Sequence, residues 1–256
     1  MTTSRRGFLG IAGGVLVGSV PVASVLARGN HVEPAPSALK GKKWAMVINV
    51  KKCLDKENCN ACQEACHAAH NVPNIEGAKE EIKWIWREGY PHAFPNQCHE
   101  YTAETLKNGN VPILCNHCEN PGCARVCPTQ ATWKREDGVV MMDMHRCIGC
   151  RYCMAGCPYG ARSFNWKDPR PFIKDLNKDF PSRMKGVVEK CNFCAERLAI
   201  GEIPLCVEAC KNADCGALVF GDLADPKSEI AELLRNSNAI RRKPELGTAP
   251  QVFYIV

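Results

Sequence analysis

Sixteen of the eighteen cysteines in this 256-residue chain fall into four groups of four. Within each group the cysteines lie close together, and three residues separate the last two in every group. So many thiols at short, repeated spacing constrain the fold more than any apolar pattern, because each group has to surround a common centre. We number the groups as runs 1 to 4: Cys53, Cys59, Cys62 and Cys66; Cys115, Cys118, Cys123 and Cys127; Cys147, Cys150, Cys153 and Cys157; and Cys191, Cys194, Cys206 and Cys210.

Run 3 has the spacing C-x2-C-x2-C-x3-C and is followed by Pro158, which is typical of bacterial [4Fe–4S] ligation. Its first three thiolates can reach one cluster. The fourth is expected to begin a helix, to point away and to bind a different cluster. Such a run therefore requires a partner run. Four runs make two pairs, so the sequence predicts four [4Fe–4S] clusters.

Runs 2 and 3 are neighbours in the sequence and are expected to form one compact unit, while runs 1 and 4 must meet from distant parts of the chain. If paired runs exchange their fourth cysteines, each thiolate is an iron ligand of one defined cluster. The expected ligand sets are cluster a, Cys53, Cys59, Cys62 and Cys210; cluster b, Cys191, Cys194, Cys206 and Cys66; cluster c, Cys115, Cys118, Cys123 and Cys157; and cluster d, Cys147, Cys150, Cys153 and Cys127.

The spacing of the cysteines leaves two alternatives to iron–sulfur clusters, namely zinc sites and disulfides. A zinc ribbon also uses C-x2-C pairs, but four ligands complete a zinc site and give no reason for a three-plus-one run that ends in proline. Disulfides suit an exported, cysteine-rich chain, but two cysteines on one tight loop pair poorly. The leftover Cys98 and Cys215 are expected to stay free, with a disulfide between them as the alternative.

The N-terminus has the pattern of an export signal. Ser4-Arg5-Arg6-Gly7-Phe8-Leu9 opens an uncharged stretch that ends at Ala27 among small residues. This predicts a twin-arginine signal over residues 1–27, followed by a linker at 28–42. The alternative is a retained membrane anchor, because the apolar stretch is just long enough to span a bilayer. We expect a periplasmic protein, exported already folded and peripheral on the cytoplasmic membrane.

Composition narrows the class of function. Hydrophobic residues make up 45% and charged residues 23%, which excludes a wholly disordered chain. The formal charge of +6 is too modest to indicate nucleic-acid binding. No acid–base pair or activated nucleophile is recognisable, and the histidines lack the spacing of a metal or catalytic site. We therefore expect a non-catalytic subunit, with no catalytic residue and no nucleic-acid partner.

The expected fold class is α+β, with tandem, pseudo-two-fold bacterial ferredoxin-like modules, loop insertions and a C-terminal extension. Each module would repeat a strand, a cysteine loop, a short helix after the closing cysteine and a second strand. Short strands are expected at 44–50, 138–143, 161–165, 186–190, 217–221 and 251–256, and a helix at 226–238.

The runs also divide the body of the chain into three segments. Residues 43–110 hold run 1 and an aromatic insert. Residues 111–170 form the central two-cluster ferredoxin unit. Residues 171–256 hold run 4 and the C-terminal extension, and they are expected to pack on residues 43–70.

Side chains between and beside the runs carry three further expectations. The aromatic insert, with Trp84 and Trp86, is either a packed surface loop or a partner-docking element. Apolar residues near the cysteines are expected to exclude water from the clusters. These residues are Ile113, Val126, Ile148 and Leu205. Three cations directly before a first cysteine are expected to be solvated, with stabilisation of the reduced cluster as the alternative, namely Lys52, Arg146 and Lys190.

The cysteine pattern resembles the four-cluster ferredoxin-type subunits of membrane-associated oxidoreductases. This family includes the electron-transfer subunits of dimethyl sulfoxide, polysulfide and tetrathionate reductases and of the Nrf nitrite-reduction system. The resemblance covers residues 43–256 and includes the prolines after runs 2 and 3 and the ending Gly247-Thr248-Ala249-Pro250-Gln251-Val252-Phe253-Tyr254. The five-residue gap between Cys53 and Cys59 departs from the family's usual two.

Three shorter segments are similar to the periplasmic O subunit of the Dsr MKJOP redox complex of sulfur-metabolising microbes. They are Glu81–Trp86, Ala131–Gly138 and His145–Met154. The resemblance implies a subunit that relays electrons through four [4Fe–4S] clusters, held by the same sixteen cysteines, in a respiratory complex linked to sulfur metabolism. The implied partners are an NrfD-like integral membrane subunit that reacts with quinone and a multihaem cytochrome c. Membrane association would come from these partners or from a retained N-terminal segment.

Two alternative functions stay in view. One is the same electron-transfer role beside a periplasmic molybdopterin oxidoreductase. The other is a zinc-stabilised interaction module without redox function, which metal analysis would distinguish.

Overall fold

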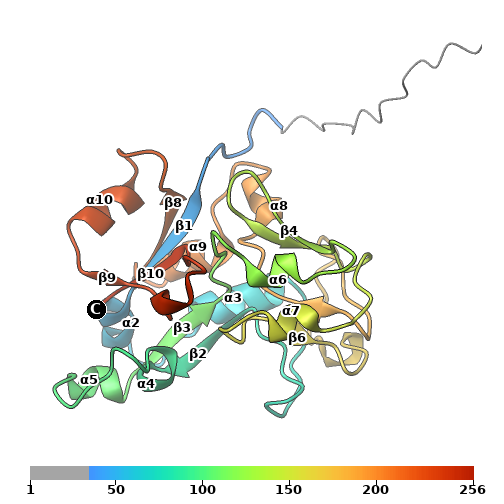
Figure 1. Ribbon diagram of the computed structural model, residues 1–256, viewed down its shortest axis with the longest axis horizontal. Coiled ribbons are helices and arrows are strands. Elements are labelled where there is room, and N and C mark those ends of the chain that lie inside the picture. Colours follow the sequence, from blue (N-terminus) through green and yellow to red (C-terminus); the bar gives the residue numbers. More distant parts are fainter. Residues whose placement is uncertain (1–34) are drawn as a thin grey trace, which may run out of the picture. The chain divides into compact units, whose positions relative to one another are not determined.

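The computed structural model describes residues 35–256, which form one compact unit (Figure 1). The expected export signal at 1–27 and the first part of the linker lie outside the described residues. Among residues 35–256, no helix is both long and apolar enough to cross a membrane.

A four-stranded sheet with the order β8-β1-β10-β9 joins the two ends of this unit. Its strands are β1 (Trp44–Asn49), β8 (Leu218–Asp222), β9 (Ala239–Ile240) and β10 (Val252–Ile255). Strand β1 pairs in parallel with β10 and antiparallel with β8, and Figure 1 shows the three side by side. The strands expected at 44–50, 217–221 and 251–256 are therefore confirmed.

Strand β1 is buried on both faces because successive side chains alternate between two apolar layers. On one face Met46 and Ile48 join the main core. On the other, Ala45 and Val47 pack with Ile230 of helix α10 (Glu229–Arg235). Ser228 caps the start of this helix, since its hydroxyl accepts a hydrogen bond from the backbone N–H of Ala231. The helix lies within the range expected at 226–238.

Three two-stranded antiparallel sheets make up the rest of the sheet structure in residues 35–256. They are β2 (Ile85–Gly89) with β3 (Asn110–Leu114), β4 (Thr132–Lys134) with β5 (Val140–Met142), and β6 (Ser163–Phe164) with β7 (Val188–Glu189). Short strands thus lie within the ranges expected at 138–143, 161–165 and 186–190. Together with the helices they give a mixed α+β protein with small sheets.

The aromatic part of the insert lies in the core and is not a surface loop, while the docking role stays a prediction. Trp84 and Trp86 are buried, and β2 begins between them. The indole Nε1 of Trp84 donates a hydrogen bond to Glu189 at 2.9 Å, and its ring stacks on His70. The remaining insert forms the short helices α4 (Tyr90–Ala93) and α5 (Glu104–Lys107). Alternation did not reveal this strand, because Trp84, Ile85 and Trp86 are three consecutive apolar residues.

Most cysteines lie on short helices or just outside them. The helices are α2 (Val50–Asp55), α3 (Ala61–Ala69), α6 (Gly122–Arg125), α7 (Tyr152–Ala155), α8 (Ala195–Leu198) and α9 (Leu205–Asn212). Two 3-10 turns, η1 (Arg170–Phe172) and η2 (Pro244–Leu246), lie in the later loops.

The structure corrects the helices that were expected after each closing cysteine. Helices α6 and α7 end before Cys127 and Cys157, while α3 and α9 contain Cys66 and Cys210. Proline directly after Cys127 and Cys157 disfavours a helical conformation at each of these two cysteines. The closing cysteine therefore lies inside a helix or just beyond its end, not at its start.

Candidate metal centres

The first set of thiols, quartet a, gathers Cys53, Cys59, Cys62 and Cys210. Burial raises the pKa of Cys62 to about 12, and the neighbouring charges of Cys53, Cys210 and Cys59 raise it as well. Helix α2 supplies Cys53, whose sulfur accepts a hydrogen bond from Nη2 of Arg87 at 3.2 Å. The structure thus brings three cysteines of run 1 together with the last cysteine of run 4.

Quartet b gathers Cys66 with Cys191, Cys194 and Cys206. All four are buried. Burial, followed by the charges of Cys191, Cys206 and Cys194, raises the pKa of the Cys66 thiol well above its usual value. The fourth cysteine of run 1 therefore lies with the first three of run 4.

Helices α3 and α9 bring the cysteines of runs 1 and 4 together. Each helix carries two cysteines four residues apart, so both thiols lie on one face. The two helices pack against each other. Along this contact, Cys62 of α3 meets Cys210 of α9, and Cys66 meets Cys206.

Quartet c gathers Cys115, Cys118, Cys123 and Cys157. Burial raises the pKa of Cys118 to about 12, the charges of Cys115, Cys157 and Cys123 add to this effect, and a hydrogen bond with Thr248 opposes it. Helices α6 and α7 are in contact, which places the loop that ends run 3 against run 2.

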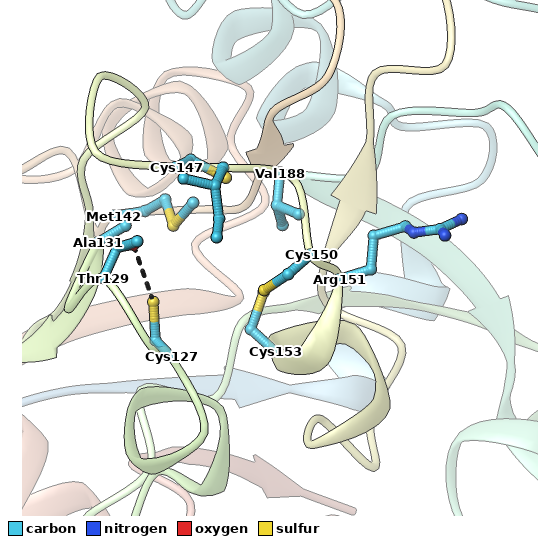
Figure 2. Close-up of a pocket in the computed structure, with 10 residues that line it drawn as sticks. Cys127, Thr129, Ala131, Met142, Cys147, Cys150, Arg151, Cys153 and Val188 are labelled. Carbon is cyan, nitrogen blue, oxygen red and sulfur yellow. Dashed lines mark hydrogen bonds between the residues drawn. The ribbon is translucent and has the colours of Figure 1, made fainter.

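Quartet d lines one small cavity (Figure 2). Figure 2 shows Cys127 facing Cys147, Cys150 and Cys153 across this cavity. A hydrogen bond of 3.7 Å joins the sulfur of Cys127 to the hydroxyl oxygen of Thr129. The last cysteine of run 2 and the first three of run 3 therefore share one centre.

The loop of run 3 requires glycine at one position. Gly149 has a φ of +70°, a backbone conformation that residues with a Cβ rarely adopt. A Cβ at this position would also clash with the carbonyl oxygen of Gly186. The close approach of these two backbones fixes the loop between Cys147 and Cys150.

The four quartets form a row. Neighbouring quartets lie near each other, because the charge of a thiol in one quartet raises the pKa of a thiol in the next; burial raises this pKa more. The pairs are Cys62 with Cys206, Cys191 with Cys115, and Cys153 with Cys123. The order along the row is therefore a, b, c, d.

The chemistry of the thiols fits a metal cofactor. Four buried thiols cannot all ionise side by side without a compensating positive charge, whereas a bound metal deprotonates a coordinating thiol outright. All cysteines of the chain lie in the described residues and none forms a disulfide, including Cys98 and Cys215. The structure brings each expected ligand set together, and the assignment of each ligand to iron stays a prediction.

Shielding from water differs between the quartets. Ile113 is fully buried, as expected, and Leu205 is half-buried. Ile148 and Val126 are 67% and 40% exposed, so the expectation that they exclude water is wrong. Both lie in the loops of runs 2 and 3, near the surface. The loops of runs 2 and 3 are therefore not shielded by these two side chains.

The cations before the first cysteines differ from one another. Lys52 and Arg146 are exposed, as expected. Lys190 is only 1% exposed, so the expectation of a solvated side chain is wrong for it. Its ammonium group donates hydrogen bonds to the carbonyl oxygen of Cys191, at 2.6 Å, and to that of Val140. These bonds replace the water that the buried charge has lost.

Three side chains near the thiols were not found from the sequence. Arg87 and Arg162 each donate a hydrogen bond to a cysteine sulfur. Burial alone would lower the pKa of His70, but its hydrogen bonds to Cys194 and Glu196 raise it to about 9. The spacing of four between Cys66 and His70 was the only local signal, since the other contacts join distant parts of the chain.

Comparison with known proteins identifies relatives of this site. The family described as "4Fe-4S dicluster domain" matches residues 106–171, which contain runs 2 and 3. The chain is 40% identical, over 98% of its length and 97% of the relative's, to the Hdr-like menaquinol oxidoreductase iron-sulfur subunit 1 of Archaeoglobus fulgidus.

Two further relatives span most of the chain. It is 38% identical to the menaquinone reductase iron-sulfur cluster-binding subunit of Nitratidesulfovibrio vulgaris, over 83% of its length and 88% of the relative's. It is 33% identical to the NrfC homolog of Haemophilus influenzae, over 98% of its length and 94% of the relative's.

Proposed function

The chain belongs to the family of [4Fe–4S] iron–sulfur subunits of reductase complexes, and from this premise we propose that it is the electron-transfer subunit of a membrane-linked menaquinol-type complex. Its cofactor is four [4Fe–4S] clusters, one for each quartet of thiols. When bound, the clusters supply one-electron redox chemistry. The observation that carries the proposal is the unbroken row of four quartets.

The protein's own residues would perform three tasks in this role. The cysteines hold the cofactor, and the exchange of cysteines between runs fixes neighbouring quartets side by side. Buried apolar residues such as Ile113 and Phe193 keep water from the inner quartets. Arginine and lysine side chains supply positive charge beside the sulfurs. Tandem modules with pseudo-two-fold symmetry fit the paired contacts of α3 with α9 and of α6 with α7.

We propose that the chain divides into the three segments that the cysteine runs predict. The proposed segments are 43–110, 111–170 and 171–256, with the last packed on 43–70. The contacts of β1 with β8 and β10 support that packing. The segment boundary at 110 falls at the start of β3, so residues 43–110 and 111–170 share a hairpin.

The finer proposal concerns partners and location. The partners are an NrfD-like integral membrane subunit and a multihaem cytochrome c, in a periplasmic complex linked to sulfur metabolism. The twin-arginine pattern at Arg5 and Arg6 supports export, and the names of the relatives from Archaeoglobus and Nitratidesulfovibrio support a quinone-linked partner. The similarity to Dsr-type O subunits supports the cytochrome.

Metal analysis of the purified chain tests the cofactor and the role. We expect about sixteen iron atoms and as many sulfides per chain, four of each per cluster, with EPR signals on reduction. Zinc in place of iron, or a reduced chain without such signals, would contradict the proposal and favour an interaction module.

Co-purification from native membranes tests the partners. We expect an integral membrane subunit and a haem c protein to remain bound, identified by mass spectrometry. A molybdopterin-containing subunit in place of the haem protein would contradict the cytochrome partner and favour the alternative complex, while leaving the electron-transfer role intact.

A further inference from the structure

Arg162 is a buried cation in the row of quartets that donates a hydrogen bond directly to a ligand sulfur. Arg162 follows run 3 in the sequence and is 5% exposed. Its Nη2 donates a hydrogen bond to the sulfur of Cys123 at 3.1 Å. Its Nη1 donates to the hydroxyl of Thr132 at 3.0 Å and contacts the sulfur of Met142 at 3.7 Å. None of these partners is a carboxylate.

These contacts place the guanidinium between quartets c and d. Cys123 belongs to quartet c. Met142 lines the cavity of quartet d, and it packs in one apolar cluster with Cys153 of the same quartet. Thr132 lies opposite Met142 in the hairpin of β4 and β5. The guanidinium charge of Arg162 therefore faces both quartets, and its hydrogen bond to Thr132 of β4 holds it in place.

A buried guanidinium without a carboxylate partner is costly unless other negative charge offsets it. The negative charge available here is that of the ligand thiolates. Reduction of a cluster adds one further negative charge, so a fixed cation at a ligand sulfur stabilises the reduced form more than the oxidised form. The hydrogen bond to the sulfur acts in the same direction.

We propose that Arg162 sets the reduction potentials of the two neighbouring clusters c and d, raising both, with the larger effect on cluster c, whose Cys123 it contacts directly. Arg162 would act on the clusters through their ligand sulfurs and would not bind iron itself. The proposal rests on the cluster assignment under the proposed function. It predicts no change in the number of iron atoms, so its failure is distinguishable from failure of that assignment.

An EPR-monitored redox titration of the complete chain tests the proposal. In Arg162→Gln we expect unchanged iron content and a fall of at least tenfold in the equilibrium constant for reduction of cluster c, which corresponds to about 59 mV for one electron. Cluster d should shift in the same direction by less, and clusters a and b should shift least. Arg162→Lys keeps the charge and should recover most of the wild-type midpoint of cluster c.

Arg170→Gln is the matched control, because Arg170 is exposed and bonded to Asp168. It should leave all four midpoints unchanged. Midpoints unchanged in a fully loaded Arg162→Gln chain, or a fall shared equally by all four clusters, would overturn the proposal.

If Arg162→Gln fails to retain iron, Thr132→Val serves in its place. This change removes the hydroxyl that orients the guanidinium while keeping a side chain of similar shape. A lower midpoint of cluster c is expected, and an unchanged midpoint would overturn the proposal.

Discussion

Glu189 is fully buried and joins three segments of the chain through its carboxylate. The oxygen Oε2 accepts a hydrogen bond from Trp84 at 2.9 Å and forms an ion pair with Nη2 of Arg183 at 2.6 Å. The oxygen Oε1 accepts from Asn165 at 2.6 Å. Because Arg183 is buried as well, each charge of this pair depends on the other.

We expect Glu189→Gln to lower the free energy of unfolding by about 3–5 kcal/mol, because it leaves the Arg183 charge buried without its partner. Urea denaturation of the cluster-loaded chain, followed by circular dichroism, measures the change. Glu136→Gln, at an exposed carboxylate, is the control and should change the stability little. Equal stability of the two variants would contradict the role of Glu189.

At the residue scale, the sequence predicted the thiols but not the charged groups around them. Regular spacing marks the cysteines, whereas Arg162, His70 and Glu189 carry no local pattern. Their partners lie far away in the sequence, so only the fold brings them together. The burial of Lys190 is likewise not predictable from the sequence, because its position next to a cysteine does not indicate whether its charge is buried.

Strand β1 is the element on which the main sheet depends. It is the only described strand that pairs with both β8 and β10. Its residue Ile48 lies opposite Leu218 of β8 and opposite Tyr254 of β10. The side chain of Ile48 is fully buried in the main core. The strand leads directly into helix α2, which carries Cys53.

We expect Ile48→Ala to cost about 2–5 kcal/mol of stability, since it removes buried methyl groups and leaves a cavity. Thermal unfolding of the cluster-loaded chain checks this. Ile200, which is 57% exposed, provides the matched control: Ile200→Ala should leave the unfolding midpoint almost unchanged. An equal loss in both variants would show that β1 is not part of a tightly packed core.

At the element scale, strands were predictable where alternation or a terminal position marked them, as in β1 and β10. The hairpin of β2 and β3 was missed because its apolar residues run together and resemble a loop with exposed aromatics. The helices near the closing cysteines were placed one turn too late. The proline after the closing cysteines of runs 2 and 3 disfavours helix at those cysteines, and so it is a signal for the end of a helix.

At the scale of the whole molecule, the exchange of cysteines makes four quartets into one row. Helices α3 and α9 join runs 1 and 4, and the contact of α6 with α7 joins runs 2 and 3. Since each run contributes to two centres, loss of one closing cysteine should affect the cluster of the partner run. Spacing alone predicts this exchange, and the assignment of ligands stays a prediction, while the linear order of quartets requires the fold.

The most direct test compares single Cys→Ser variants of the central pair of runs by EPR of the reduced chain. We expect Cys157→Ser to alter the same cluster signal as Cys118→Ser, and Cys127→Ser to alter the same signal as Cys150→Ser. If Cys157→Ser instead alters the signal affected by Cys150→Ser, each run holds its own cluster, and the interlocked row is contradicted.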